Sequence, residues 1–323
     1  MGPRAVVGID IGGTKTLSAV VEPAGRVLAR HRIETPQTGP EGVVAALTRS
    51  VAAVAASAGL RNEDLLGIGV GAPGPLDPAT GVVFEPPNLV GWRDVPLARL
   101  LQDAVGFEVF VENDANAAAL GEAWVGAGAG VRDLIYITVS TGIGGGLILN
   151  GDLYHGVSGT AGEIGHMTVE PDGPICTCGR RGHLEAVASG QAIARMAAEV
   201  VRAGRPTRLS TLGPPEALTA ELVARAAIEG DPLARDIYAR AGAYIGAAVA
   251  SLVNVLNPAM VIFGGGVIKA GNLLFDPVRR AVRERAFERP AAAVRIVPAA
   301  LGDDAGVIGA AAVVYRRLGS ESP

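Results

Sequence analysis

The sequence has little cysteine, little lysine, few aromatic residues and no excess of basic charge. Its 323 residues include two cysteines, which excludes a framework of several disulfides. Aromatic residues make up 4% of the chain, and 28 basic against 32 acidic side chains give a net charge of −4. Proteins that bind nucleic acid or anionic lipid carry a basic surface, so neither is expected as a partner.

The sequence also lacks the features of an exported or membrane-spanning protein. The first ten residues contain no long apolar segment of a signal peptide, which favours a cytoplasmic location. A run of 28 uncharged residues separates Arg240 from Lys269, enough to cross a bilayer. Asn254, Asn257 and Pro258 interrupt this run. We therefore expect a buried helix, an Asn-Pro turn and a short strand here, and no membrane span.

The chain is rich in apolar residues instead. Hydrophobic residues make up 49% and charged residues 19%, which excludes a disordered protein, and the length predicts roughly two domains of about 150 residues. In the first part, short β-rich runs and alanine-rich amphipathic runs follow one another in the order βββαβαβα. The expected strands are 5–11, 16–22, 26–34, 65–71 and 108–112, and the expected helices are 41–57, 96–104 and 114–124.

The same order recurs in the second part, with insertions. The expected strands are 133–140, 145–150, 166–170, 259–263 and 293–297, and the helical segments are 184–256 (with an inserted helix pair), 272–287 and 303–317. This duplication predicts an α/β fold of two similar domains around a cleft. The expected domains are 1–115 plus 303–323, whose last helix packs back on the first domain, and 116–302.

Two glycine-rich turns lie at equivalent places in the repeat. Residues 10–15 read Asp-Ile-Gly-Gly-Thr-Lys and residues 141–146 read Thr-Gly-Ile-Gly-Gly-Gly, each after a predicted strand. Either one alone is explained by a hairpin turn that needs positive φ. As an equivalent pair, they predict a site for the phosphates of a nucleotide. A third run, Gly264–Gly266, follows a strand and would let an adenine lie against the backbone, or simply form a tight turn.

Asn113 and Asp114 follow a predicted strand and open a predicted helix. A carboxylate at this position caps helix N–H groups well, which is one explanation for Asp114. The other is a general base at the carboxyl end of a strand, beside an Asn113 amide that offers both a donor and an acceptor to a polyol.

Both cysteines and two of the four histidines are close together in the sequence. They form the pattern His166-x9-Cys176-x-Cys178-x4-His183 on a loop rich in glycine and proline. These residue types form tetrahedral zinc sites, and four protein ligands would make the zinc structural. The alternative is two ordinary thiols and two incidental histidines. Glu163 and Glu185 flank this loop and are either solvated or available to sugar hydroxyls.

Taken together, these motifs resemble the ROK family of sugar kinases and repressors. The matching segments span nearly the whole chain: DIGGTK (10–15), ENDANAAALGE (112–122), STGIGGG (140–146), GTAGEIGHMTVEPDG (159–173), CTCGRRGHLEAVASG (176–190) and FGGGV (263–267). The resemblance implies the ribonuclease-H-like, actin-like ATPase fold. It also implies ATP-dependent phosphorylation of the 6-hydroxyl of a hexose, with glucose expected.

The resemblance implies a role for each site residue. Asp114 would be the catalytic base, and Mg²⁺ would be held through Asp10. The hexose would be bound by Asn88, Asn113, Asp114, Glu163, His166 and Glu185. ATP would be bound by Gly12, Gly13, Thr14, Lys15, Thr141, Gly142, Gly265 and Gly266. His183 departs from the family, which usually has cysteine there, although imidazole is an acceptable ligand.

Other functions of the same family remain open at this stage. One is a kinase for N-acetylmannosamine or another hexose. Another is a sugar-responsive repressor, although only Met1 to Arg4 precede the first predicted strand and leave no room for a DNA-binding region. A sugar-binding protein without catalysis is a third. The enzyme is expected to be a homodimer or homotetramer. Because the phosphate turns are expected to lie away from the metal loop, loss of zinc should weaken hexose binding more than ATP binding.

Overall fold

The computed structural model of the chain describes residues 4–319, and its first sheet has five strands. They run in the order β3-β2-β1-β4-β8, with β1 antiparallel to β2 and parallel to β4. The bounds are β1 Ala5–Ile11, β2 Lys15–Val21, β3 Val27–Glu34, β4 Leu65–Ala72 and β8 Val109–Asn113. Strands β4 and β8 are also parallel, so the carboxyl ends of β1, β4 and β8 lie at one edge of the sheet.

The second sheet repeats this order. Its strands run β11-β10-β9-β12-β13, so each position of the first sheet has a counterpart. The bounds are β9 Leu134–Val139, β10 Ile143–Leu149, β11 Asp152–Leu153, β12 Met260–Gly264 and β13 Arg295–Pro298. The predicted duplication is thus present in the topology, and the turns at 12–14 and 140–142 join equivalent strand pairs. A third, small sheet was not predicted: β5 Leu76–Asp77, β6 Val82–Val83 and β7 Val95–Pro96.

The predicted strand at 166–170 is wrong. The third strand of the second sheet is the short β11, which pairs with β10. In the segment 166–170 the Val169 and Glu170 N–H groups both donate to the Gly182 carbonyl, at 2.9 and 3.1 Å. These donors therefore tie the segment to the Cys176–His183 loop and not to a sheet.

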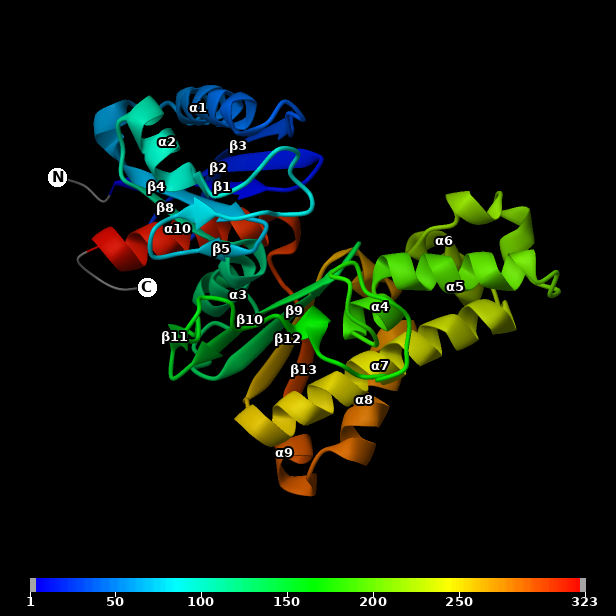
Figure 1. The fold of residues 1–323 in the computed structure, drawn as a ribbon. Helices are drawn as coiled ribbons and strands as arrows, with labels where there is room; N and C mark the ends of the chain where they lie inside the picture. Colours follow the sequence, from blue (N-terminus) through cyan, green and yellow to red (C-terminus); the bar gives the residue numbers. More distant parts are fainter. Residues whose placement is uncertain (1–3, 320–323) are drawn as a thin grey trace. The chain divides into compact units, whose positions relative to one another are not determined.

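Strand β1 is buried on both faces, because helices cover both sides of its sheet (Figure 1). Alternate residues such as Val7 and Ile9 pack with α1 (Pro40–Ser57) and α2 (Leu97–Val105). Val6, on the opposite face, packs against α10 (Ala305–Leu318). The two-residue period of a strand puts Asp10 on this second face, directed at α10.

Helix α3 (Asp114–Val125) packs closely against α10. A side-chain carbon on Gly309 would collide with the Ala117 carbonyl, and one on Gly121 would lie 2.7 Å from the Ala305 carbonyl. The buried Glu122 carboxylate accepts N–H groups from Ala300 and Leu301, at 3.1 and 2.8 Å, just before α10 begins. The last helix therefore belongs with the first sheet.

The chain divides into two compact units. Unit 1 contains 1–136, 146–162 and 299–323, and unit 2 contains 137–145 and 163–298. The repeat in the sequence predicts boundaries near 115 and 303, and those domain limits stay a prediction. The units differ from them chiefly because α3 packs on α10 and because 146–162 groups with the first sheet.

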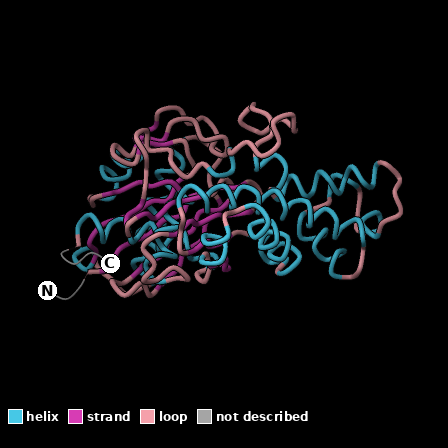
Figure 2. Tube along the Cα trace, turned by 90° about the horizontal axis from the view of Figure 1, so that it is seen from below, coloured by secondary structure: helices cyan, strands magenta, loops and turns pink. Residues whose placement is uncertain are grey.

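Unit 2 contains most of the remaining helices. They are α4 Leu184–Ala188, α5 Gly190–Arg202, α6 Ala220–Ile228, α7 Pro232–Leu256, α8 Asn272–Arg285 and α9 Glu288–Ala293. Helices α5, α6 and the first part of α7 extend beyond the strands (Figures 1 and 2). They contain the helix pair that was predicted as an insertion. Short 3₁₀ turns are η1 Asn62–Asp64, η2 Ile164–His166, η3 Arg208–Thr211, η4 Pro215–Ala217, η5 Gly266–Ala270 and η6 Gly302–Asp304.

Helix α7 covers most of the long uncharged run. Within residues 4–319 it is the one helix long and apolar enough to cross a membrane. In the structure it packs against α4, α5, α6 and α8, and side chains such as Ile245 and Val249 are fully buried. Asn257, in the left-handed conformation with φ 47°, ends it just before β12. The predicted buried helix, turn and strand are confirmed.

Candidate functional site

The turn between β1 and β2 is held by the segment that follows β3. The Thr35 hydroxyl donates to the Gly12 carbonyl at 2.7 Å, and the Gln37 amide donates to the Gly13 carbonyl at 2.9 Å. The Thr35 N–H donates to the Thr14 carbonyl at 2.9 Å. Carbonyl oxygens repel phosphate oxygens, so turning three of them toward 35–37 leaves the exposed Thr14 and Lys15 available to an anion.

Neither Thr35 nor Gln37 was predicted to contribute to this site. The only signal in the sequence is a pair of polar side chains just after β3, the strand that pairs with β2 on the far side of the turn. Asn88, which was predicted to contact the hexose, lies beside this turn, and its role stays a prediction. Its Cβ and carbonyl oxygen would each be 3.1 Å from a side-chain carbon on Gly13.

Asp10 and Asp114 lie near one another at the carboxyl edge of the first sheet. Asp10 pairs in register with Gly71 of the neighbouring strand β4. Because glycine has no side chain, Gly71 leaves the space beside Asp114 open. Burial, together with the negative charge of Asp114, raises the pKa of Asp10 to about 7. A side-chain carbon on Gly306 would lie 2.7 Å from the Asp10 Oδ2 atom, so α10 needs glycine there.

This pair of carboxylates fits a divalent cation. Two negative charges that repel each other in a buried setting are both stabilised when a cation binds. Carboxylate oxygens and water are the ligands that Mg²⁺ prefers. Asp10 and Asp114 could therefore hold Mg²⁺, directly or through water.

Asn113 and Asp114 both accept hydrogen bonds from the first N–H groups of α3. The Asn113 Oδ1 atom accepts the N–H groups of Ala115 and Asn116, at 3.0 and 3.1 Å. Asp114 is the first residue of α3, and its Oδ1 atom accepts the Ala115 N–H at 2.8 Å. The Asn113 side chain therefore caps α3, and Asp114 adds one acceptor for a first-turn N–H, so its role as a base stays a prediction.

A buried polar network supports this corner of unit 1. Glu112 is 3% exposed, and its Oε1 atom accepts the Asn113 N–H and the Asn116 side-chain amide, both at 3.0 Å. Its Oε2 atom lies 2.7 Å from the His155 Nε2 atom. The hydrogen bond to Glu112 raises the pKa of His155, against opposing effects of burial and of the nearby Arg317 charge. The contact of His155 with Glu112 was not predicted, because 43 residues separate the two in the chain.

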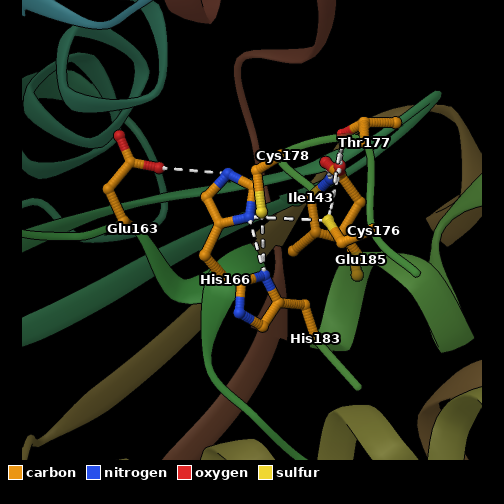
Figure 3. A network of polar contacts seen from close by, with 8 residues as sticks. All are labelled: Ile143, Glu163, His166, Cys176, Thr177, Cys178, His183 and Glu185. Carbon is orange, nitrogen blue, oxygen red and sulfur yellow. Dashed lines mark hydrogen bonds and ion pairs between the residues drawn. The ribbon is translucent and has the colours of Figure 1, made fainter. Parts of the chain in front are cut away.

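The four predicted metal ligands of unit 2 come together. The ligand atoms of His166, Cys176, Cys178 and His183 all lie within 4.8 Å of one another (Figure 3). The two Nδ1 atoms are 3.3 Å apart, and the Nδ1–Sγ distances are 3.7 Å for His166–Cys176 and 3.2 Å for His183–Cys178. Around a tetrahedral zinc ion the expected separations are about 3.3 Å for N–N and about 3.5 Å for N–S.

The protonation chemistry of the cluster also suits a cation. Burial lowers the pKa of His183, assisted by the charges of His166 and Arg180, and so favours the neutral imidazole that binds metals. Burial raises the pKa of the Cys176 thiol, because it disfavours the charged thiolate. A bound cation would stabilise that thiolate. The spacing in the sequence thus predicted a cluster whose geometry and chemistry could hold zinc.

Glu163 and Glu185 lie on either side of this cluster. The His166 Nε2 atom, on the opposite side of the ring from the cluster, is 3.8 Å from the Glu163 Oε2 atom (Figure 3). Glu185 lies next to the second glycine turn instead, where its Oε2 atom accepts the Ile143 N–H at 3.0 Å. The expectation that the phosphate turns lie away from the metal loop is therefore wrong for the turn at 141–142.

The third glycine run, Gly264–Gly266, packs against the carboxyl end of β9. Gly265 has φ 87°, and a side-chain carbon there would collide with the Val139 carbonyl. Gly266 is exposed and has open space beside it. Thr141, Gly142, Gly265 and Gly266 therefore all lie near the carboxyl end of β9, which the sequence could not show for segments 120 residues apart.

Known proteins of similar sequence and structure match this chain over nearly its whole length. A glucokinase from Halalkalibacterium halodurans is 40% identical over 323 residues, which cover 99% of this chain and 98% of the relative. A solved ROK hexokinase from Thermus thermophilus has a TM-score of 0.82 and 38% identity, covering 98% of this chain and 100% of its own. A solved ROK family glucokinase from Streptomyces griseus, in complex with glucose and AMPPNP, has a TM-score of 0.82 and 38% identity, covering 96% and 98%.

These solved structures and the repeated strand order confirm the predicted α/β fold of the actin-like ATPase type. The ROK family model matches residues 6–317, which is nearly all of the sequence. By this match and by its full-length relatives, the chain belongs to the ROK family.

Proposed function

We propose that this protein is an ATP-dependent glucose kinase that transfers the γ-phosphoryl group to the 6-hydroxyl of glucose. The observation that carries the proposal is the place of Asp114. It is a carboxylate at the carboxyl edge of the first sheet, beside Asp10 and next to a glycine turn suited to phosphate. The 40% identity to a glucokinase over the whole chain supports glucose as the acceptor.

In the proposed reaction Asp114 takes the proton of the attacking hydroxyl. The hydroxyl oxygen forms a bond to the γ-phosphorus, the bond from this phosphorus to the β,γ-bridging oxygen breaks, and ADP leaves. Phosphoryl transfer depends mainly on positioning and on compensation of charge. Asp10 would hold Mg²⁺, directly or through water, and the ion would offset negative charge on the phosphates.

The remaining site residues are proposed to bind the two substrates. ATP would contact backbone N–H groups and side chains of Gly12, Gly13, Thr14, Lys15, Thr141, Gly142, Gly265 and Gly266. The hexose hydroxyls would contact Asn88, Asn113, Asp114, Glu163, His166 and Glu185. His166 suits two tasks, because its Nδ1 atom faces the metal cluster while its Nε2 atom is directed away from it.

The cluster of His166, Cys176, Cys178 and His183 is proposed to bind one structural zinc ion. Four protein ligands would leave no open coordination position, so zinc would shape the loop and not activate a substrate. We also propose that the protein acts in the cytoplasm as a homodimer or homotetramer, which sedimentation analysis of the purified chain would test.

A kinetic panel tests the proposed reaction. With ATP as donor and a coupled assay for ADP, glucose should give the highest kcat/KM among common hexoses. A site that bonds a particular hydroxyl strongly rejects analogues that lack it. N-acetylmannosamine exceeding glucose tenfold would keep the kinase and change its substrate, and no turnover with any hexose would refute the kinase.

The variant Asp114→Asn tests the proposed base. Asparagine keeps an oxygen for the Ala115 N–H but takes no proton at neutral pH, so kcat should fall by about 10²–10⁴. Calorimetry should show that glucose still binds. Asp103→Asn, which changes an exposed carboxylate of unit 1, is the control and should keep full turnover. If Asp114→Asn retains more than about half of the rate, Asp114 is not the base.

A further inference from the structure

The carboxylate of Glu185 joins the metal-binding loop to the glycine turn at 141–143. Its Oε1 atom accepts the Thr177 hydroxyl at 2.8 Å and lies 3.7 Å from the Cys176 Sγ atom. Its Oε2 atom accepts the Ile143 N–H at 3.0 Å (Figure 3). One side chain therefore contacts the loop that carries the cysteines and, at the same time, the backbone of the turn.

The turn fits tightly against this carboxylate. A side-chain carbon on Gly142 would collide with the Glu185 Oε2 atom, so the glycine brings its backbone directly onto the glutamate. The Ile143 N–H is the first donor after the turn, and an N–H bonded to a carboxylate is strongly held. The position of Glu185 thus fixes the end of the turn.

The start of α5 holds the other end of the turn. The Gly190 N–H donates to the Ser140 carbonyl at 2.8 Å, and the Gln191 N–H donates to the Thr141 carbonyl at 3.3 Å. The short helix α4 connects the metal ligand His183 directly to these residues. The turn is therefore fixed on both sides by a stretch of chain that begins in the metal cluster.

We propose that Glu185 is a positioning residue through which the metal-binding loop sets the shape of the turn at 141–143, so that metal occupancy controls affinity for the nucleotide. This inference rests on the proposed function, in which the turn contacts the phosphates of ATP. Metal binding orders Cys176 and Cys178, the loop presents the Thr177 hydroxyl to Glu185, and Glu185 holds the Ile143 N–H. Loss of any of these contacts loosens the turn and weakens nucleotide binding.

Thr177→Val tests the link without changing a metal ligand or a residue assigned to a substrate. Valine has nearly the shape of threonine but cannot donate to Glu185. Titration calorimetry with Mg²⁺–AMPPNP in the absence of sugar should show a Kd about 3- to 10-fold higher than in the parent. Glucose titrated alone should lose less affinity than AMPPNP, because Glu185 is one of six residues assigned to the hexose. Thr177→Ser restores the hydroxyl and should restore nucleotide affinity.

Two further preparations complete the experiment. Thr211→Val removes another exposed hydroxyl of unit 2, one that donates to the Arg208 carbonyl, and should leave both affinities unchanged. Parent protein stripped of zinc by a chelator should show at least the nucleotide weakening of Thr177→Val. Zinc content is measured on every preparation.

The outcomes distinguish this inference from the proposed function. Unchanged AMPPNP affinity in Thr177→Val, whatever its zinc content, overturns the coupling while leaving the kinase in place. Unchanged affinity in the zinc-stripped parent overturns the metal dependence. A parent that contains zinc but binds no AMPPNP overturns the proposed function and this inference together.

Discussion

His183 is the residue at which the proposed zinc cluster departs from the usual ligands of its family. Its Nδ1 atom lies 3.2 Å from the Cys178 Sγ atom and 3.3 Å from the His166 Nδ1 atom, as a fourth ligand requires. It is 5% exposed, and burial lowers its pKa. Both properties keep the imidazole neutral and directed at the cluster, which is the form that binds zinc.

The parent protein should contain about one zinc per chain, and His183→Ala should lose most of it. Three remaining protein ligands bind the metal less tightly, so the loop should loosen and the KM for glucose should rise. His183→Cys should keep zinc and most of the activity, because thiolate is an equally good tetrahedral ligand. Metal analysis and kinetics on the three proteins decide the matter. Full zinc occupancy with a normal glucose KM in His183→Ala would show that His183 is not a ligand.

Helices α3 and α10 meet backbone to backbone, and this contact forms the back of the Asp114 site. Gly121 and Gly309 face one another, and the nearest Gly309 atom to a side-chain carbon on Gly121 would be 3.0 Å away. Ala117 and Ala310 are fully buried nearby. Small side chains let the two helices approach, and that approach sets the position of the first turn of α3 relative to β1.

Gly309→Ala should therefore destabilise the protein by about 1–3 kcal/mol, because the added methyl group meets the Ala117 backbone and the helices must move apart. In a helix without such a neighbour, the same change stabilises by about 0.5–1 kcal/mol. The sign of the change in thermal unfolding temperature thus tests the packing. We also expect kcat to fall, since α3 carries Asp114. An increase in unfolding temperature would contradict the contact.

At the scale of the whole molecule, a few polar contacts connect segments that are far apart in the chain. Glu112 ends a strand of the first sheet, and His155 lies 43 residues later, in the segment after β11. Arg30 and Asp304, 274 residues apart, form a two-pronged ion pair beside the start of α10. Of these contacts, the one between the buried Glu112 carboxylate and the half-buried His155 ring makes the stability of the fold depend on pH.

The contribution of His155 to stability should be present at low pH and lost at high pH. Its pKa is raised in the folded protein, so the folded state holds the proton more tightly. The stabilisation is complete below the unfolded value of about 6.5 and disappears as the pH rises through the folded value. Because the ring is partly exposed, we expect about 1 kcal/mol.

Denaturation of the parent and of His155→Gln at pH 6 and pH 9 checks this prediction. Glutamine still donates a hydrogen bond to Glu112 but carries no charge, so the difference in unfolding free energy should be larger at pH 6. His31→Gln is the control, because the His31 ring bonds to the uncharged Ser50 hydroxyl. An equal difference between parent and His155→Gln at both pH values would refute the charged pair.

The sequence by itself determined the parts that depend on local pattern. Apolar periodicity located every strand of the first sheet to within a residue or two. Most of these strands are short apolar runs bounded by turn residues, and this pattern is local in the sequence. The spacing of His166, Cys176, Cys178 and His183 predicted their cluster, because a short loop brings ligands of this spacing together. The equivalence of the two glycine turns followed from the repeat.

Only the tertiary structure decided which partner each polar group takes. The pattern suggested Asp114 as the cap of α3, whereas the Asn113 side chain is the N-cap in the structure. The pattern predicted a strand at 166–170, whereas the Gly182 carbonyl takes its backbone donors. The sequence assigned Glu185 to the hexose, and only the structure shows that it also accepts the N–H of Ile143, 42 residues away in the chain, at 3.0 Å. Such contacts depend on how sheets and loops pack, and no local periodicity encodes them.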